Sequence, residues 1–414
     1  MGQWLGDAVL FRHLRKLGSW FFLSKTLTIA CSVWVTRLLR PEDFSIIASV
    51  LAIQGIVIMV AGVNFYSNLV RADTVSDEEL EVAWSCDLVR NLILAIGLFS
   101  SAPHVARVVD LPEAALVFQV SSLQLVLVGL RNPRLLELRR NGKFGVLGAQ
   151  ESIGPVAYAV SSVVLAMFRP DYWALVGAGL LSFVASSVGS YVRLPWRPRI
   201  SFNWDLARPM INFGLVVQAG AILSTMRQHS LTLLLILFSL SEEVGYLNRA
   251  VTFSMAISLQ FVSLFWKVSY PHYAKIENGG GCSMSSAKEL QRKIVFMGVP
   301  LSVFIAITGW YLIPIILGPE WRPIRPIWSI LIVASVFIAA NTVVDSALQA
   351  SRREHLCLRL QAIGTACQLV FSFLFIAVLG LNGAGGGVLV ATLVVLGLQQ
   401  KFCEPSNLGE PKAS

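Results

Sequence analysis

Long apolar runs separated by short polar segments dominate the hydrophobic pattern of this chain. A helix needs about 20 apolar residues to cross a bilayer, and twelve segments fit that length. They lie near 18–36, 45–68, 83–103, 114–130, 146–168, 172–191, 209–237, 243–266, 293–317, 325–350, 357–380 and 383–400. The pattern therefore predicts an all-α polytopic membrane protein with about twelve transmembrane helices.

The seventh segment is the least regular, because Arg227, Gln228 and His229 interrupt it. It could be one broken helix that crosses once, or two short helices. With one crossing, 23 of the 33 Lys and Arg residues fall on the side of the N-terminus, 6 on the opposite side and 4 inside segments. Because basic loops stay cytoplasmic, we predict one crossing and cytoplasmic locations for both termini.

Composition excludes a water-soluble domain, because 55% of residues are hydrophobic, 14% are charged and the mean hydropathy is +0.67. The first apolar run has no small-residue cleavage site and is expected to span the membrane. The net charge of +9 follows from the basic loops. Since the chain has no nucleic-acid module and no Walker lysine loop, neither nucleic acid nor ATP is expected as a partner. The six scattered cysteines predict no disulfide and no zinc site.

A basic loop at 193–199 divides the chain into an N-terminal half, 1–200, and a C-terminal half, 201–414, with a short polar tail. Each half contains six predicted helices. An even number per half gives both halves the same orientation, which is the arrangement of parallel repeats related by an axis along the membrane normal.

Pairs of acidic residues support this internal repeat. Glu42 and Asp43 follow the first helix of the N-terminal half, and Glu242 and Glu243 follow the first helix of the C-terminal half. We therefore expect the two pairs to lie at equivalent outward corners.

The segment Thr36-Arg37-Leu38-Leu39-Arg40-Pro41-Glu42-Asp43-Phe44 fits a helix-loop-helix corner, since Pro41 cannot extend the preceding helix and the acids suit a helix N-terminus. It also resembles the Arg-Leu-Leu-x-Pro-Glu-Asp-Phe-Gly signature of the bacterial polysaccharide exporters. This is the Wzx-like oligosaccharide flippase family, in the superfamily that also holds MATE-type multidrug and lipid II transporters. Ser45 replaces the usual Gly, so this turn must use ordinary backbone angles.

Two further segments are similar to signatures of that family, namely 270–274 (Tyr-Pro-His-Tyr-Ala) and 318–321 (Gly-Pro-Glu-Trp). The resemblance implies a MATE-like fold of two six-helix lobes in the bacterial cytoplasmic membrane. It implies that undecaprenyl-diphosphate-linked oligosaccharide repeat units are flipped for exopolysaccharide, capsule or O-antigen synthesis. A polysaccharide polymerase and a chain-length regulator would then be partners.

Five basic or titratable residues in the predicted helices are candidates for substrate binding, because a charge inside a bilayer normally faces the protein interior or a wet cavity. They are Arg227, Arg249, Lys25, Arg90 and His229. Arg227 is the strongest candidate, because no acid lies within a turn of it. Lys25 either lines a cavity or extends toward the cytoplasmic headgroups.

Three acids are candidates for proton or sodium coupling, namely Asp345, Glu151 and Asp87. Asp345 could equally form a hydrogen bond between helices. Asp87 lies three residues before Arg90, on the same helical face, where the two charges can neutralise each other. No bound cofactor is expected.

Within the predicted helices, basic residues outnumber acids, which predicts a cationic central cavity that suits a diphosphate. Alternating access by two lobes would then move the substrate. A multidrug or organic-cation antiporter of the same fold is an alternative, but its cavity would need a negative charge to bind cations. A glycan polymerase or ligase would need a sizeable outward catalytic loop, so we expect a transporter and not an enzyme.

Single-cysteine labelling tests the predicted topology. Reagents that do not cross the membrane should leave Cys282 unlabelled in intact cells and label it in inverted vesicles, because the basic loops are assigned to the cytoplasm. Labelling of Cys282 from outside intact cells would contradict both the predicted orientation of the chain and the predicted positive charge of the central cavity.

Overall fold

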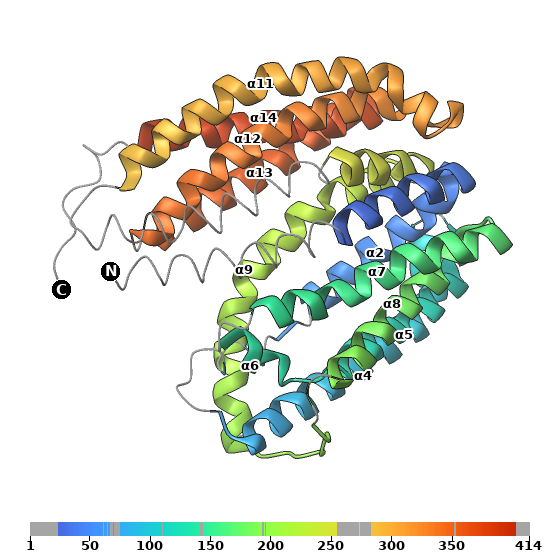
Figure 1. Cartoon of the computed structure of the whole chain (residues 1–414), viewed down its shortest axis with the longest axis vertical. Helices are drawn as coiled ribbons and strands as arrows, with labels where there is room; N and C mark the ends of the chain where they lie inside the picture. The colour runs from blue at the N-terminus through green and yellow to red at the C-terminus, as the bar shows by residue number, and fades with distance from the viewer. Residues whose placement is uncertain are drawn as a thin grey trace. The chain divides into compact units, whose positions relative to one another are not determined.

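The computed structural model describes residues 24–60, 62–63, 65–66, 69, 75–109, 111–140, 144–192, 194, 196–254, 273, 283–351 and 353–402. Regular structure in this part of the chain is helical (Figure 1). The helices are α2 (Pro41–Val60), α4 (Asp77–Val108), α5 (Ala115–Gly129), α6 (Leu135–Arg140), α7 (Phe144–Phe168), α8 (Tyr172–Val192), α9 (Trp204–Leu237), α11 (Ser283–Ile316), α12 (Ile324–Ala350), α13 (Glu354–Leu379) and α14 (Leu381–Phe402). Residues 24–38 and 244–254 are also helical.

Nine helices of the described ranges are long and apolar enough to cross a membrane. Large apolar side chains on them are open to the surroundings, such as Phe296 at 83% and Val378 at 80% exposure. Lipid tails would cover such side chains. The seventh expected span is one continuous helix, α9. The first, second and eighth expected spans lie partly outside the described residues.

The chain forms two compact units, Met1–Ile222 and Leu223–Ser414. The division falls inside α9, whereas the boundary expected from the sequence lies just before that helix, near residue 200. We call the two parts unit 1 and unit 2.

The same packing scheme occurs in both units. In unit 1, α4 packs along α5, α7 packs along α8, and α5 also contacts α8 (Figure 1). In unit 2, α11 packs along α12, α13 packs along α14, and α12 also contacts α14. In each half, the third expected span thus packs along the fourth, the fifth packs along the sixth, and the fourth contacts the sixth. The shared scheme supports the repeat inferred from the sequence.

The acidic corner of unit 1 joins two helix N-termini. Pro41 starts α2, and Asp43 in its first turn accepts a 2.9 Å hydrogen bond from the Arg40 amide. The other oxygen of Asp43 accepts a 2.9 Å bond from the Tyr172 amide, at the start of α8. Ser45 lies within α2, and its hydroxyl donates to the Pro41 carbonyl, so no special backbone angle is needed there.

Glu243 repeats this arrangement in unit 2. Its Oε2 accepts a 3.0 Å hydrogen bond from the Leu381 amide, at the start of α14. The second acid of each pair therefore caps the helix of the sixth expected span in its half of the chain, where orphan amides and the helix dipole favour a carboxylate.

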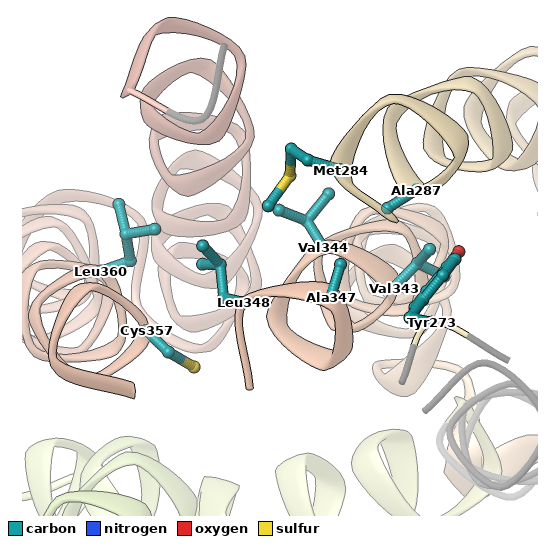
Figure 2. Packing of buried hydrophobic residues seen from close by; sticks show 9 residues of the cluster. All are labelled: Tyr273, Met284, Ala287, Val343, Val344, Ala347, Leu348, Cys357 and Leu360. Atoms are coloured by element: carbon teal, nitrogen blue, oxygen red, sulfur yellow. The ribbon is translucent and has the colours of Figure 1, made fainter. Parts of the chain in front are cut away.

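The segment 267–292 lies between the eighth and ninth expected spans and was therefore expected to be a loop. It is helical from Ser283 onward; residues 267–272 and 274–282 lie outside the described ranges. Met284 and Ala287 of α11 pack on a core formed by α12 and α13, and Figure 2 shows Met284 directed toward Val344. The expectation was wrong for 283–292 because hydropathy marks only the apolar part of a helix. Tyr273 also joins this core, which comprises Tyr273, Met284, Ala287, Val343, Val344, Ala347, Leu348, Cys357 and Leu360.

The second signature similar to the polysaccharide exporters is a packed turn between α11 and α12. Gly318 has a φ of 115°, a conformation open mainly to glycine. It places Trp321, which is 1% exposed, against the Tyr246 ring with centroids 5.8 Å apart.

Loss of the carboxylate at the unit 1 corner should lower stability. Asp43→Ala removes the acceptor for two backbone amides, and replacing a helix cap costs about 0.5–2 kcal/mol. We expect a lower midpoint of thermal unfolding for the purified protein, and a smaller loss for Asp43→Asn, which keeps one acceptor. Glu42 is exposed, so Glu42→Gln is the matched control and should leave the midpoint unchanged. An equal loss for Glu42→Gln would contradict the capping role.

Candidate functional site

An ion pair on α4 contributes to the polar interior of unit 1. Arg90 Nη2 lies 2.7 Å from Asp87 Oδ1, one turn apart on the helix. Arg90 also donates to the Val63 carbonyl, and its guanidinium carbon lies 5.7 Å from the Phe65 ring centroid. The neutralising pair expected from the sequence is therefore present in the structure.

A cavity of about 280 Å³ lies beside this ion pair within unit 1. Its polar lining residues are Tyr66, Asp87, Arg131, Asn132, Gln150 and Glu151. A more open cavity of about 520 Å³ adjoins it and is lined by Thr28, Tyr158, Ser182 and Ser186 among others. Arg131 and Glu151 line both cavities, so the two spaces meet at these opposite charges.

The end of α5 positions Arg131. Asn132 donates from its side chain to the carbonyls of Ser190 and Leu194, at 3.2 and 2.7 Å, and its amide donates to Ser190 Oγ at 3.0 Å. These bonds fix the backbone next to Arg131 against the end of α8. Burial lowers the pKa of the Arg131 guanidinium, and the Glu151 carboxylate opposes this by raising it.

Sequence reasoning counted Arg131 only as a basic loop residue and did not select it. A basic residue directly after an apolar span, followed by Asn132 and Pro133, resembles an ordinary helix end. Only the fold brings α7, with Gln150 and Glu151, to face it.

In unit 2, Arg227 of α9 and Asp345 of α12 line one cavity of about 40 Å³. That space holds about one water molecule. The two side chains interact electrostatically, although 118 positions separate them in the chain. Asp345 Oδ1 accepts a 3.0 Å hydrogen bond from Gln399 of α14.

Side-chain amides surround this pair and extend across unit 2. Gln368 donates to the Arg227 carbonyl and to Ser230 Oγ, both at 3.0 Å. On the other side, Gln399 accepts a 2.7 Å bond from Gln291 of α11. Further members are Asn341, which donates to the Thr392 carbonyl, Gln400, which donates to Gln291, and Lys288, which donates to the Gln400 carbonyl.

The sequence analysis did not identify this amide network. Its signal was the presence of Gln and Asn within apolar segments, where polar side chains commonly join helices by hydrogen bonds. Its amide side chains come from four helices, α11, α12, α13 and α14, so no local sequence motif marks it.

The other predicted site residues lie elsewhere. Lys25 is half-buried on the helix at 24–38, and His229 is half-buried on α9. Arg249 lies on the helix at 244–254 and donates to Asn248 Oδ1 at 2.7 Å. None of the three is among the lining residues of the cavities above. Their roles in substrate binding stay predictions.

The cavity at Arg131 in unit 1 and the cavity at Arg227 in unit 2 both contain charged and amide side chains, which suits binding of a ligand by hydrogen bonds and charge. Within the described residues, no group of three or more His, Cys, Asp or Glu side chains could hold a metal ion.

Two characterised proteins are similar in sequence. The lipopolysaccharide biosynthesis protein WzxC of Escherichia coli (strain K12) is 19% identical over 371 residues, covering 88% of this chain and 73% of WzxC. The succinoglycan biosynthesis transport protein ExoT of Rhizobium meliloti (strain 1021) is 30% identical over 213 residues, covering 49% of this chain and 42% of ExoT.

The solved structure of the lipid II flippase MurJ, in an inward closed conformation, has the same fold. Its TM-score is 0.79 at 12% identity, covering 94% of this chain and 87% of MurJ. The expected fold class, an all-α polytopic membrane protein of two six-helix lobes, is confirmed. The expectation of a transporter, and not an enzyme, agrees with these relatives.

The family model described as "Polysaccharide biosynthesis protein" matches residues 34–326, which is well over half of the chain. The match begins just before the corner with Asp43 and ends in the first turn of α12. The chain belongs to this family of polysaccharide biosynthesis proteins.

Proposed function

We propose that the chain flips undecaprenyl-diphosphate-linked oligosaccharide repeat units across the bacterial cytoplasmic membrane, for exopolysaccharide, capsule or O-antigen synthesis. Membership of the polysaccharide biosynthesis family supports the process. The names of WzxC, ExoT and MurJ support a lipid-linked glycan as the substrate class.

The observation that carries the proposal is the polar cavity of unit 1. A glycan exposes many hydroxyl groups, and each costs several kcal/mol in hydrocarbon unless it is hydrogen-bonded. Arg131, Gln150 and Glu151 offer donors and acceptors among helices that otherwise present apolar side chains. Such a lining lowers the cost of moving a sugar through the membrane.

Basic residues are proposed to hold the diphosphate. Arg227 and Arg249 are the main candidates, with Lys25, Arg90 and His229 as further ones. The cavity at Arg227, about 40 Å³, is smaller than a diphosphate. Binding there therefore requires a conformation in which Arg227 separates from Asp345 and the cavity widens.

Alternating access is the proposed mechanism, since two halves of the same orientation can rock against each other. Protons or sodium ions would drive it through Asp345, Glu151 or Asp87. Asp345 is the best placed of these, because it lines one cavity with Arg227 and its carboxylate accepts a hydrogen bond from the Gln399 amide. Both termini would lie in the cytoplasm. A polysaccharide polymerase and a chain-length regulator would be the partners that act on the flipped repeat units.

Deletion of the gene tests the proposed function. Lipid-linked repeat units should accumulate on the inner leaflet, and a surface polysaccharide should be lost, while sensitivity to cationic drugs stays unchanged. Mass spectrometry of extracted lipids would measure the amount of lipid-linked glycan, and a leaflet assay would show on which side of the membrane it accumulates. Normal polysaccharide together with lost dye efflux would instead support a multidrug antiporter.

Charge removal at Arg227 separates substrate binding from structural pairing. Arg227→Gln should reduce polysaccharide export at least about tenfold at normal membrane abundance if the guanidinium holds phosphate oxygens. Arg227→Lys should restore part of the export, because Lys supplies charge without the two-pronged geometry.

The outcome differs if Arg227 serves only to neutralise Asp345. Arg227→Gln should then lower membrane abundance, and Arg227→Gln with Asp345→Asn should restore it, because no unpaired charge is left. Full export by well-expressed Arg227→Gln and Arg249→Gln proteins would exclude a phosphate-binding role for both arginines.

A further inference from the structure

Two buried polar atoms of opposite hydrogen-bonding character lie unpartnered in unit 1. Arg131 Nε is a donor without an acceptor, and Gln150 Oε1 is an acceptor without a donor. Both residues line the cavity of about 280 Å³. A buried group left unpaired costs about 1–3 kcal/mol, so this arrangement favours a ligand that completes both bonds.

The neighbouring contacts leave these two atoms available. Gln150 Nε2 donates to the Ser186 carbonyl at 3.4 Å, which leaves the amide oxygen as the group without a partner. Gly154 and Gly189 allow this close approach of α7 and α8, since a Cβ at Gly189 would come within 3.2 Å of Gln150 Nε2. Arg131 is held through the anchored backbone of Asn132.

Hydrogen-bond character decides the class of ligand. A hydroxyl group both donates and accepts, so sugar hydroxyls can pair with Arg131 Nε and with Gln150 Oε1. A fully ionised phosphate only accepts, which leaves Gln150 Oε1 unpaired. An ammonium group only donates, which leaves Arg131 Nε unpaired.

The charge balance favours the same class. Asp87, Glu151 and Arg131 line the cavity, and Arg90 pairs with Asp87 beside it, so two acids offset two cations. A neutral ligand fits a balanced site better than a diphosphate does. Tyr66 adds an aromatic ring to the wall of this cavity, and Tyr158 adds one to the adjoining cavity. Polar groups beside aromatic rings are typical of specific binding pockets.

We infer that the cavity at Arg131 and Gln150 is a saccharide-binding subsite, which takes a sugar ring of the glycan and not its diphosphate. The inference rests on the proposed function, because it assigns one part of that substrate to one part of unit 1. On the predicted topology, Arg131 follows the inner end of α5, so the sugar would be bound from the cytoplasmic leaflet.

Two lipid probes test the subsite with the full-length protein in nanodiscs. One is the lipid-linked repeat unit extracted from the deletion strain, and the other is sugar-free undecaprenyl diphosphate. Wild-type protein should bind the glycan lipid more tightly. Arg131→Gln and Gln150→Met should each weaken binding of the glycan lipid about tenfold and leave binding of the sugar-free lipid unchanged.

Control variants keep the result interpretable. Gln54→Met also removes a buried amide from unit 1, but Gln54 bonds to the Ser121 carbonyl away from the cavity, so affinity for the glycan lipid should be unchanged. Arg134→Gln serves likewise for Arg131, since Arg134 pairs with Asp77. Gln150→Glu keeps an acceptor and should retain more affinity than Gln150→Met. Thermal unfolding in the same nanodiscs checks that each variant is folded.

Three outcomes would overturn the inference. Equal weakening for both probes would assign the cavity to the diphosphate, and unchanged binding of the glycan lipid by folded variants would mean that the cavity holds only water. Equal affinity of wild-type protein for both probes would also remove the sugar subsite, while leaving the flippase function intact. Absence of accumulated glycan lipid in the deletion strain would reject the proposed function itself, and the subsite with it.

Discussion

Hydrocarbon offers no hydrogen-bond partners, so every polar group at membrane depth must find its partner inside the protein. Helix termini at the outward corners are also satisfied within the protein. Asp43 and Glu243 each accept a hydrogen bond from an amide at the start of another helix of the same unit. The amides of unit 2 show this requirement, because Gln291, Gln399 and Gln400 pair with one another across helices. Because most such groups are paired, a buried group without a hydrogen-bond partner, such as Arg131 Nε, marks a place where a ligand can bind.

The sequence predicted the apolar part of each helix well, because lipid selects for length and hydropathy. The sixth expected span, 172–191, differs by one residue from α8 (Tyr172–Val192). Helix ends outside the hydrocarbon were missed for the same reason. Ser283–Arg292 of α11 and the short helix α6 contain many polar residues, so they read as loops.

The candidate sites were predictable only in part. Asp87 and Arg90 are one turn apart, so their pairing follows from helix geometry. Arg227 and Asp345 were each noticed as charges, but their shared cavity depends on how α9 packs with α12, α13 and α14. Arg131 was overlooked because its significance comes from Gln150 and Glu151 on another helix. The paired acids were noticed as a sign of internal repetition, but the hydrogen bonds by which Asp43 and Glu243 cap other helices could be seen only in the fold.

The position of the unit boundary inside α9 has a mechanical consequence. Gln218, on one side of it, donates to the Met59 carbonyl of unit 1, and the Arg227 carbonyl, on the other side, accepts from Gln368 of unit 2. Each end of this short stretch is therefore tied to a different body. Between these two anchors α9 continues as a helix for about two turns, so this stretch of backbone is a flexural coupling that joins the two units.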